Sequence, residues 1–166
     1  MFSKSKKNSA QINDDYQLNH HFILVDAAKE LVAPQAILWG EALWWPKNSS
    51  MKFTRLTPGD IRVGTRYRQE VLLPFAPSWE VEVTGLITDH EIERTFLNGI
   101  FKGKETVSVQ ECSNVTKVDY RLQYQLRGFI NTILWPMVFA RMHDQNIKMI
   151  LKALQEYIMN KEVKGV

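Results

Sequence analysis

A stripe of apolar residues near the C-terminus carries two polar side chains that could take part in proton transfer. His143 lies one helical turn before Ile147 in this stripe, and Asn146 lies beside it. A histidine that faces a bound molecule can act as a general acid or base, because its ordinary pKa is close to neutral pH. The alternative is a partly exposed, structural histidine at the edge of the stripe. We therefore treat His143 as a candidate catalytic residue, with Tyr120 as the second candidate.

Three tyrosines occupy apolar positions in segments where apolar and polar residues alternate. This alternation predicts that Tyr67, Tyr120 and Tyr124 lie on the covered face of a sheet. Gln69 shares that face with Tyr67. A buried tyrosine hydroxyl needs a hydrogen-bond partner. It would either orient a ligand in a cavity or bond to a backbone carbonyl in a filled core.

Two opposite charges also fall on faces that should be covered. Glu105 shares a face with Val107, and Arg94 shares one with Ile92. The two charges could pair inside the protein or polarise a ligand carbonyl, since unpaired burial of either one would be costly. The alternative is that both lie at strand ends and reach water, because charged residues are rarely fully buried.

Large aromatic rings are further candidates for the wall of a ligand cavity. Trp39, Trp44 and Trp45 fall in a short helical region and are a candidate gate, and Trp79 begins a later strand. Plain packing is the alternative, because large aromatic residues dominate protein cores. The residues expected to contact a ligand are Trp44, Tyr67, Gln69, Trp79, Glu105, Tyr120, Tyr124, His143, Asn146 and Ile150.

Sequence motifs of several other chemistries are absent. The chain has no HExxH, no CxxC, no glycine-rich phosphate loop and no G-x-S-x-G. Four histidines and one cysteine give no metal-ligand spacing. His20 and His21, adjacent in an expected strand, should point to opposite faces. We expect no metal and no cofactor.

The composition is that of one globular domain. The chain has 166 residues, and its 45% hydrophobic and 23% charged residues exclude a mostly disordered protein. The net charge of +3 comes from residues 1–18 and 148–166, so it indicates no nucleic-acid partner. Cys112 is the only cysteine, so no intramolecular disulfide can form. Without a signal peptide or an apolar segment long enough to span a bilayer, a cytoplasmic location is expected.

A sheet and a helix are needed to position these side chains. Residues 116–126 alternate strictly, which is typical of an antiparallel strand with one covered face. Further strands are expected at 20–27, 52–56, 65–73, 79–88, 91–97 and 102–111. After Gly128 the apolar positions recur every three or four residues, which predicts a long helix at 129–160 with a kink near Pro136.

One or two short helices are expected at 34–45, between the first two strands. Pro34 suits the first turn of a helix, and Pro46 would end the segment. Only the long C-terminal helix could cover the dry face of the sheet, so the element order predicts an α+β fold. Residues 129–140 are apolar all round and are expected to be buried or to contact a membrane or a partner.

This layout resembles the SRPBCC superfamily of START-like, helix-grip proteins, and within it the polyketide cyclase/dehydrase-like branch. The resemblance covers about residues 19–160 and rests on the element order and three local patterns. They are a first strand followed by a helix from Ala33-Pro34 into Trp44-Trp45-Pro46, the turn Leu56-Thr57-Pro58-Gly59 with Gly64 after it, and the helix end Ile147-Lys148-Met149-Ile150-Leu151-Lys152-Ala153-Leu154. The resemblance implies a curved antiparallel sheet wrapped around a long C-terminal helix, with two short helices after the first strand and an apolar cavity between sheet and helix.

The expected organisation is a disordered polar tail at 1–18, a START-like ligand-binding domain at 19–160 and a C-terminal tail at 161–166. The first hypothesis is a carrier or sensor that holds a hydrophobic or aromatic, lipid- or polyketide-like molecule in the cavity. The second is a cyclase- or dehydratase-type lyase or isomerase that uses a cavity tyrosine and histidine as acid and base. The third is a protein-interaction module. The expected partner is the apolar ligand, and the sequence is compatible with transient membrane contact but not with an integral membrane segment.

Overall fold

The computed structural model describes residues 16–128 and 140–164. In chain order the elements are β1 (Gln17–Val25), α1 (Lys29–Ile37), β2 (Met51–Arg55), β3 (Arg66–Val71), β4 (Ser78–Ile87), β5 (Glu91–Phe96), β6 (Phe101–Cys112), β7 (Val115–Leu126) and α3 (Ala140–Lys164). Every strand begins and ends within three residues of the bounds expected from the sequence. The α+β prediction is confirmed.

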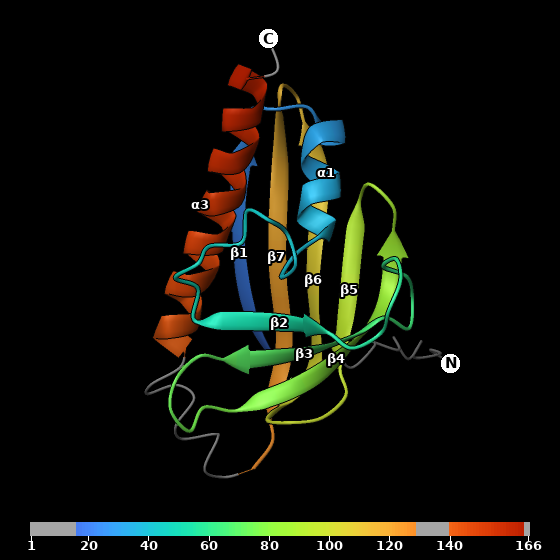
Figure 1. Ribbon diagram of the computed structural model, residues 1–166, viewed down its shortest axis with the longest axis vertical. Helices are drawn as coiled ribbons and strands as arrows, with labels where there is room; N and C mark the ends of the chain where they lie inside the picture. The colour runs from blue at the N-terminus through green and yellow to red at the C-terminus, as the bar shows by residue number, and fades with distance from the viewer. Residues whose placement is uncertain (1–15, 129–139, 165–166) are drawn as a thin grey trace, which may run out of the picture.

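The strands of the described chain form one antiparallel sheet in the order β1-β7-β6-β5-β4-β3-β2. Each strand from β2 to β6 pairs with the next one in sequence, whereas the first strand pairs with the last. In Figure 1 the strands β1, β7, β6 and β5 run along the molecule, and β2 to β4 cross their lower end. The sheet is therefore strongly curved. The helix α3 lies along β1, and α1 lies against β6 and β7.

Alternation along the strands decides which residues the sheet covers. In β7 every second residue from Thr116 to Tyr124 is buried, whereas Arg121 and Gln123 are exposed. The strands β3 to β6 follow the same alternation. The prediction of one covered face is confirmed, and the polar residues Gln69, Arg94 and Glu105 on that face are buried.

The helix α3 provides part of the cover. Its buried apolar residues lie on one face at spacings of one, three and four: Ile147, Ile150, Leu151, Leu154 and Ile158. Burial of each such side chain stabilises the fold by about 1.5–3 kcal/mol. The helix continues to Lys164, beyond its expected end at Asn160. Its expected first part and kink, at 129–139, lie outside the described residues.

The segment between β1 and β2 differs from the sequence expectation. Of the two short helices expected there one forms, α1, and Pro34 lies inside it rather than in its first turn. Residues 38–50, all of them described, form successive turns instead of a second helix. Gly40 has a φ of 90° in these turns, and an added Cβ would collide with the ring of Phe53. A left-handed residue ends the helical hydrogen-bond pattern, so the helix cannot continue through it.

The expected tails fall partly outside the described chain. Of residues 1–18 only 16–18 are described, and β1 already begins at Gln17. Residues 161–164 of the expected C-terminal tail belong to α3. Within the described residues, no helix is long and apolar enough to cross a membrane.

Gly103, where β6 approaches β7 closely, provides a test of the sheet. Its φ is 132°, and an added Cβ would collide with the backbone oxygen of Gln123. We expect Gly103→Ala to lower the free energy of unfolding by about 3 kcal/mol or more, because only glycine tolerates this backbone and the opposing backbone cannot move aside. Gly64→Ala is the matched control: Gly64 has a φ of 89° with nothing within 4 Å of an added Cβ, so strain alone should cost about 1–2 kcal/mol. Equal losses in urea unfolding would contradict the close approach.

Candidate functional site

A cluster of polar side chains is buried on the covered face of the sheet. Gln69 of β3, Arg94 of β5, Glu105 of β6 and Tyr120 of β7 are each at most 2% exposed. The strand register places Arg94 directly opposite Glu105. Arg94 Nη1 donates to Glu105 Oε1 at 3.3 Å, and Gln69 Nε2 donates to the same oxygen at 2.8 Å. We call these four residues the polar cluster.

Gln69 links the polar cluster to the indole of Trp79. The two residues lie opposite each other in the β3–β4 register, and Trp79 Nε1 donates to Gln69 Oε1 at 2.5 Å. The amide oxygen of Gln69 thus accepts from Trp79 while its nitrogen donates to Glu105, which fixes the orientation of the amide. Trp79 also packs edge-on against Phe101, with ring centroids 4.8 Å apart. An aromatic wall therefore adjoins the polar cluster.

Arg94 is a charged residue held wholly inside the protein. Its Nη2 donates to the backbone oxygen of Trp39 at 3.0 Å, and its guanidinium lies over the ring of Tyr67, 5.1 Å from the centroid. Burial raises the pKa of Glu105, and the charge of Arg94 opposes that rise. Of the alternatives that the sequence left open for Arg94 and Glu105, the structure realises pairing inside the protein.

Tyr120 connects the polar cluster to α3. Its hydroxyl lies 3.4 Å from Nε2 of His143, a long hydrogen bond, and its ring stacks on Trp39 with centroids 5.3 Å apart. Burial, together with the charge of Glu105, raises the pKa of Tyr120 well above its ordinary value of 10. Burial lowers the pKa of His143 to about 4. Both side chains are therefore neutral at neutral pH, and the tautomer of His143 decides which of the two donates in this contact.

The two adjacent histidines of β1 contact opposite faces of the sheet, as predicted. His20 Nε2 lies 2.8 Å from Oδ1 of Asp119 on the outer face. His21 Nε2 lies 3.0 Å from Oδ1 of Asp144 on α3, and Asn19 Nδ2 donates to the same oxygen at 2.6 Å. Burial alone would raise the pKa of Asp144, but the hydrogen bonds from Asn19 and His21 lower it. Asp144 thus fixes α3 against the edge strand β1.

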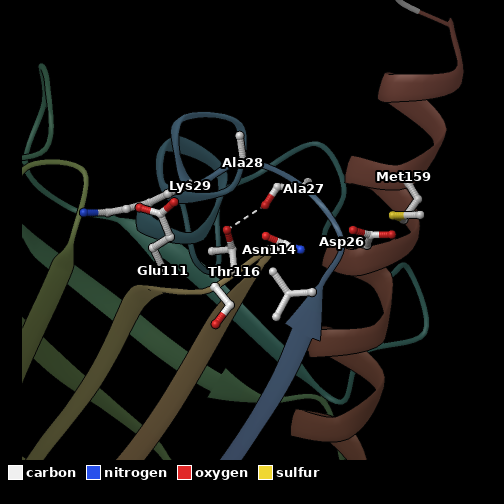
Figure 2. Close-up of a pocket in the computed structure, with 10 residues that line it drawn as sticks. Asp26, Ala27, Ala28, Lys29, Glu111, Asn114, Thr116 and Met159 are labelled. Atoms are coloured by element: carbon white, nitrogen blue, oxygen red, sulfur yellow. Dashed lines mark hydrogen bonds between the residues drawn. The ribbon is translucent and has the colours of Figure 1, made fainter.

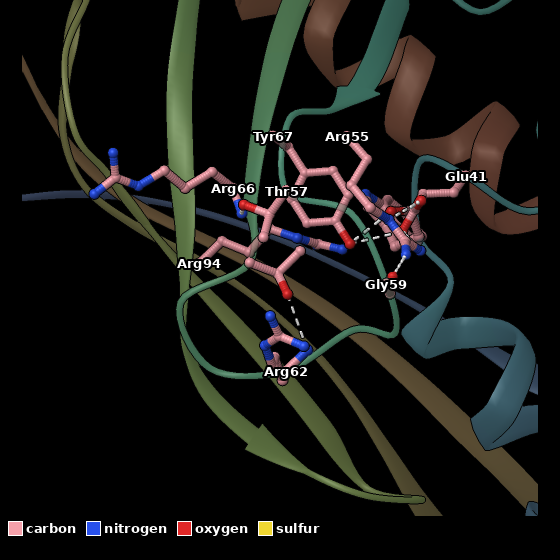
Figure 3. A network of polar contacts seen from close by, with 10 residues as sticks. Glu41, Arg55, Thr57, Gly59, Arg62, Arg66, Tyr67 and Arg94 are labelled. Atoms are coloured by element: carbon pink, nitrogen blue, oxygen red, sulfur yellow. Dashed lines mark hydrogen bonds and ion pairs between the residues drawn. The ribbon is translucent and has the colours of Figure 1, made fainter.

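A second polar network lies at the end of β2 (Figure 3). The hydroxyl of Tyr67 donates to Glu41 Oε1 at 2.6 Å. Arg55 holds both oxygens of Glu41, with Nε 2.7 Å from Oε2 and Nη2 2.9 Å from Oε1, and it also donates to the backbone oxygen of Gly59. Burial and the bond to Glu41 raise the pKa of Tyr67 to about 12. The Tyr67 hydroxyl is thus committed to a carboxylate, a partner that the sequence did not indicate.

The structure brings five of the ten expected ligand-binding residues together. They are Gln69, Trp79, Glu105, Tyr120 and His143. Arg94 belongs to the polar cluster but is not among the expected ligand-binding residues, although it is expected to be a charge on a covered face. The sequence of one strand shows only that Arg94 alternates with apolar residues. Its place in the site follows from the pairing of β5 with β6, which puts Arg94 opposite Glu105.

The other five expected residues are buried but have structural partners. Asn146 Oδ1 accepts from the Ser50 amide at 2.9 Å, which ties α3 to the start of β2. Tyr124 packs edge-on against Phe101, with ring centroids 5.6 Å apart. The remaining three belong to the hydrophobic core: Trp44, Tyr67 and Ile150. Their part in ligand binding stays a prediction.

A pocket of about 540 Å³ lies at the other end of the molecule (Figure 2). It is formed by the β1–α1 connection, the β6–β7 turn and Met159 of α3, and it includes Asp26 and Glu111. None of its lining residues belongs to the polar cluster. Part of the helix expected to wall the inner cavity, residues 129–139, lies outside the described chain. Within residues 16–128 and 140–164, no three His, Cys, Asp or Glu side chains are placed to hold a metal ion.

Comparison with known proteins reveals likeness in fold but none in sequence. No protein-family model matches the chain, and no curated protein matches its sequence. The Zhui aromatase/cyclase from Streptomyces sp. R1128 is 17% identical with a TM-score of 0.67, over 88% of this chain and 95% of its own. Norcoclaurine synthase from Thalictrum flavum, in complex with dopamine and hydroxybenzaldehyde, is 14% identical with a TM-score of 0.64, over 96% and 98%. A START superfamily protein from Mycobacterium smegmatis is 14% identical with a TM-score of 0.62, over 86% and 97%.

Removal of Arg94 tests the buried ion pair. We expect Arg94→Met to lower the free energy of unfolding by about 3–5 kcal/mol at pH 8, because it leaves Glu105 buried without its counter-charge. A buried carboxyl with a raised pKa is favoured in its protonated form, so the loss should shrink as the pH falls towards 5. The double variant Arg94→Met/Glu105→Gln should recover much of the loss at pH 8. Urea unfolding measures all three, and a pH-independent loss would contradict the pairing.

Acid titration of the folded protein tests the environment of His143. Its pKa of about 4 lies below the ordinary 6.5, so the unfolded chain binds the proton first. Stability should therefore fall as the pH drops from about 6.5 to 4, by up to roughly 3 kcal/mol. We expect His143→Gln to flatten that fall, as measured by the urea midpoint at pH 7, 6 and 5. A parallel decline in the two proteins would mean that His143 is not the titrating group.

Proposed function

We propose, from the helix-grip fold that this chain shares with the START-like, SRPBCC proteins, that it binds a hydrophobic or aromatic small molecule against the polar cluster. It would act as a carrier or sensor of a lipid- or polyketide-like compound. The observation that carries the proposal is the line of buried polar groups from Gln69 through Glu105 and Tyr120 to His143. We further propose a cytoplasmic location, on the sequence evidence alone.

Stability alone does not require this line of buried polar groups in the core. Buried ion pairs are often no more stabilising than well-packed apolar residues of the same volume. A ligand site, in contrast, combines apolar walls with a few fixed polar groups that orient the ligand. The walls here are aromatic, with Trp39 stacked on Tyr120 and Trp79 packed on Phe101.

Each polar group has a distinct proposed role. The neutral Tyr120 hydroxyl would donate to a carbonyl or hydroxyl oxygen of the ligand, and the neutral His143 Nε2 would accept from a ligand hydroxyl. Arg94 and Glu105 would act as positioning residues, because their pairing holds Gln69 and Tyr120 in place. Ligand affinity would come mainly from the burial of apolar surface.

The contact between Tyr120 and His143 favours a cyclase- or dehydratase-type enzyme as the second candidate function. In an aldol closure, His143 would accept a proton from the carbon next to a carbonyl, while Tyr120 donates to the oxygen of the forming enolate. The enolate carbon would attack a second carbonyl of the same molecule, and the imidazolium would return the proton to the new alkoxide. A dehydration would then release water. Solved structures with the same fold include an aromatase/cyclase and norcoclaurine synthase.

Mass spectrometry of small molecules extracted from the freshly purified, denatured protein tests the binding proposal. We expect a stoichiometric apolar compound that carries an oxygen function. That compound should quench tryptophan fluorescence on rebinding, and Tyr120→Phe should weaken its Kd by about 5- to 30-fold through loss of one buried hydrogen bond. Tyr157→Phe, at a partly buried tyrosine of α3 that packs against the core outside the polar cluster, is the matched control and should bind normally.

The His143→Ala variant separates the two candidate functions. A carrier should show no turnover of the extracted compound and should lose only the hydrogen bond that His143 accepts, which would weaken its Kd by about 5- to 30-fold. An enzyme should lose turnover of that compound while it still binds it. An empty extract, together with no fluorescence response to aromatic or lipid-like compounds, would contradict both functions and favour the protein-interaction module.

A further inference from the structure

The loop between β3 and β4 exposes three large apolar side chains. Leu72 is 54% exposed, Leu73 is 43% exposed and Phe75 is fully exposed. The loop carries no charged residue between Leu72 and Pro77. Single exposed apolar residues are common on protein surfaces, but three within four residues form a compact apolar tip. We call residues 72–77 the apolar loop.

The backbone of the apolar loop is already hydrogen-bonded within the protein. The amides of Leu72, Leu73 and Ala76 donate to the backbone oxygens of Ser50, Val71 and Leu73, respectively. Pro74 and Pro77 have no amide hydrogen to satisfy. A loop that enters a lipid bilayer must leave few polar backbone groups unpaired, because the hydrocarbon offers them no partner. For the amide N–H groups of this loop, that requirement is met at every residue except Phe75.

Folding does not explain the position of Phe75. Its φ is 60°, a left-handed conformation that L-residues adopt at a cost of about 1–2 kcal/mol and that is rare for a bulky residue. Burial of the ring does not offset this strain, because the ring is fully exposed. A strained, fully exposed aromatic residue at a loop tip is typical of a contact with something outside the protein.

The segments around the apolar loop carry exposed positive charges. Figure 1 shows the apolar loop below the N-terminal end of α3, at the end of the molecule where β7 finishes. The apolar loop, residues 97–100, residues 126–128 and the first turn of α3 contain no Asp or Glu. They contain two exposed arginines, Arg127 and Arg141. Apolar side chains beside arginines are complementary to a bilayer with anionic headgroups.

We propose that the apolar loop docks on anionic lipid membranes, with Phe75 and the two leucines entering the boundary between headgroups and acyl chains and with Arg127 and Arg141 against the headgroups. A bilayer is favoured over a protein partner because the loop combines exposed apolar side chains with few free amide donors, and because exposed arginines lie at the same end of the molecule. The docking goes beyond the proposed ligand binding and needs no ligand. It is therefore tested on vesicles alone, independently of the extraction experiment.

Sedimentation of the full-length protein with vesicles tests the proposal. The vesicles are phosphatidylcholine, with or without phosphatidylserine. We expect binding to the mixed vesicles, weakened about tenfold by Phe75→Asn, since the ring is lost. Asparagine tolerates a left-handed φ, so this variant should keep its fold, as circular dichroism can check. Leu43→Asn removes another exposed side chain, 98% exposed, from the α1–β2 connection and should bind like the unchanged protein.

The arginines are tested by the dependence on lipid charge. Arg127→Gln/Arg141→Gln should lose most of the extra binding that phosphatidylserine brings, about tenfold, while binding to pure phosphatidylcholine stays the same. High salt should have the same effect on the unchanged protein. Absence of vesicle binding would overturn the proposal. Equal weakening by Phe75→Asn and Leu43→Asn would also overturn it, because any exposed apolar side chain would then contribute to binding and the apolar loop would have no special role.

Discussion

The buried ion pair between Arg94 and Glu105 constrains the structure around it. Two charges taken out of water are tolerated only when they are paired and hydrogen-bonded. Gln69, the backbone oxygen of Trp39 and the ring of Tyr67 supply those further contacts. A shift of one residue in the register of β5 and β6 would send one charge to the outer face and leave the other unpaired. The pair therefore specifies the register of the central strands.

The same constraint shapes the candidate site. Arg94 and Glu105 hold each other and Gln69 in place. The buried polar groups that continue to Tyr120 and His143 are therefore anchored at that end. Their far end is neutral, since burial keeps the tyrosine protonated and the histidine unprotonated. A fixed charged end and a neutral donor–acceptor end, bordered by aromatic rings, suit recognition of a largely apolar molecule with an oxygen function. The same neutral pair could also pass a proton in a water-poor environment.

The strand β3 relates the candidate site to the apolar loop. Gln69 contributes to the polar cluster, and Leu72 opens the apolar loop just after the strand ends at Val71. Leu72 is also bonded to Ser50, whose amide is held by Asn146 of α3. The proposed membrane contact and the proposed ligand site thus share a strand and a helix. Ligand exchange at a bilayer would be a natural use of that arrangement.

The sequence by itself determined the element order, the covered faces of β3 to β7 and the opposite directions of His20 and His21. These follow from periods of two and of three to four residues, which are local properties of the chain. It did not determine that residues 38–50 form turns. That depends on the ring of Phe53, from a strand outside this segment, which packs so close to Gly40 that it leaves no room for a Cβ. It also did not determine which polar residues meet. Arg94 faces Glu105, and Tyr67 bonds to Glu41, only because the register of the sheet and the path of the α1–β2 connection bring distant segments together. The alternating pattern of a strand specifies a face, whereas a partner across strands is specified only by tertiary packing.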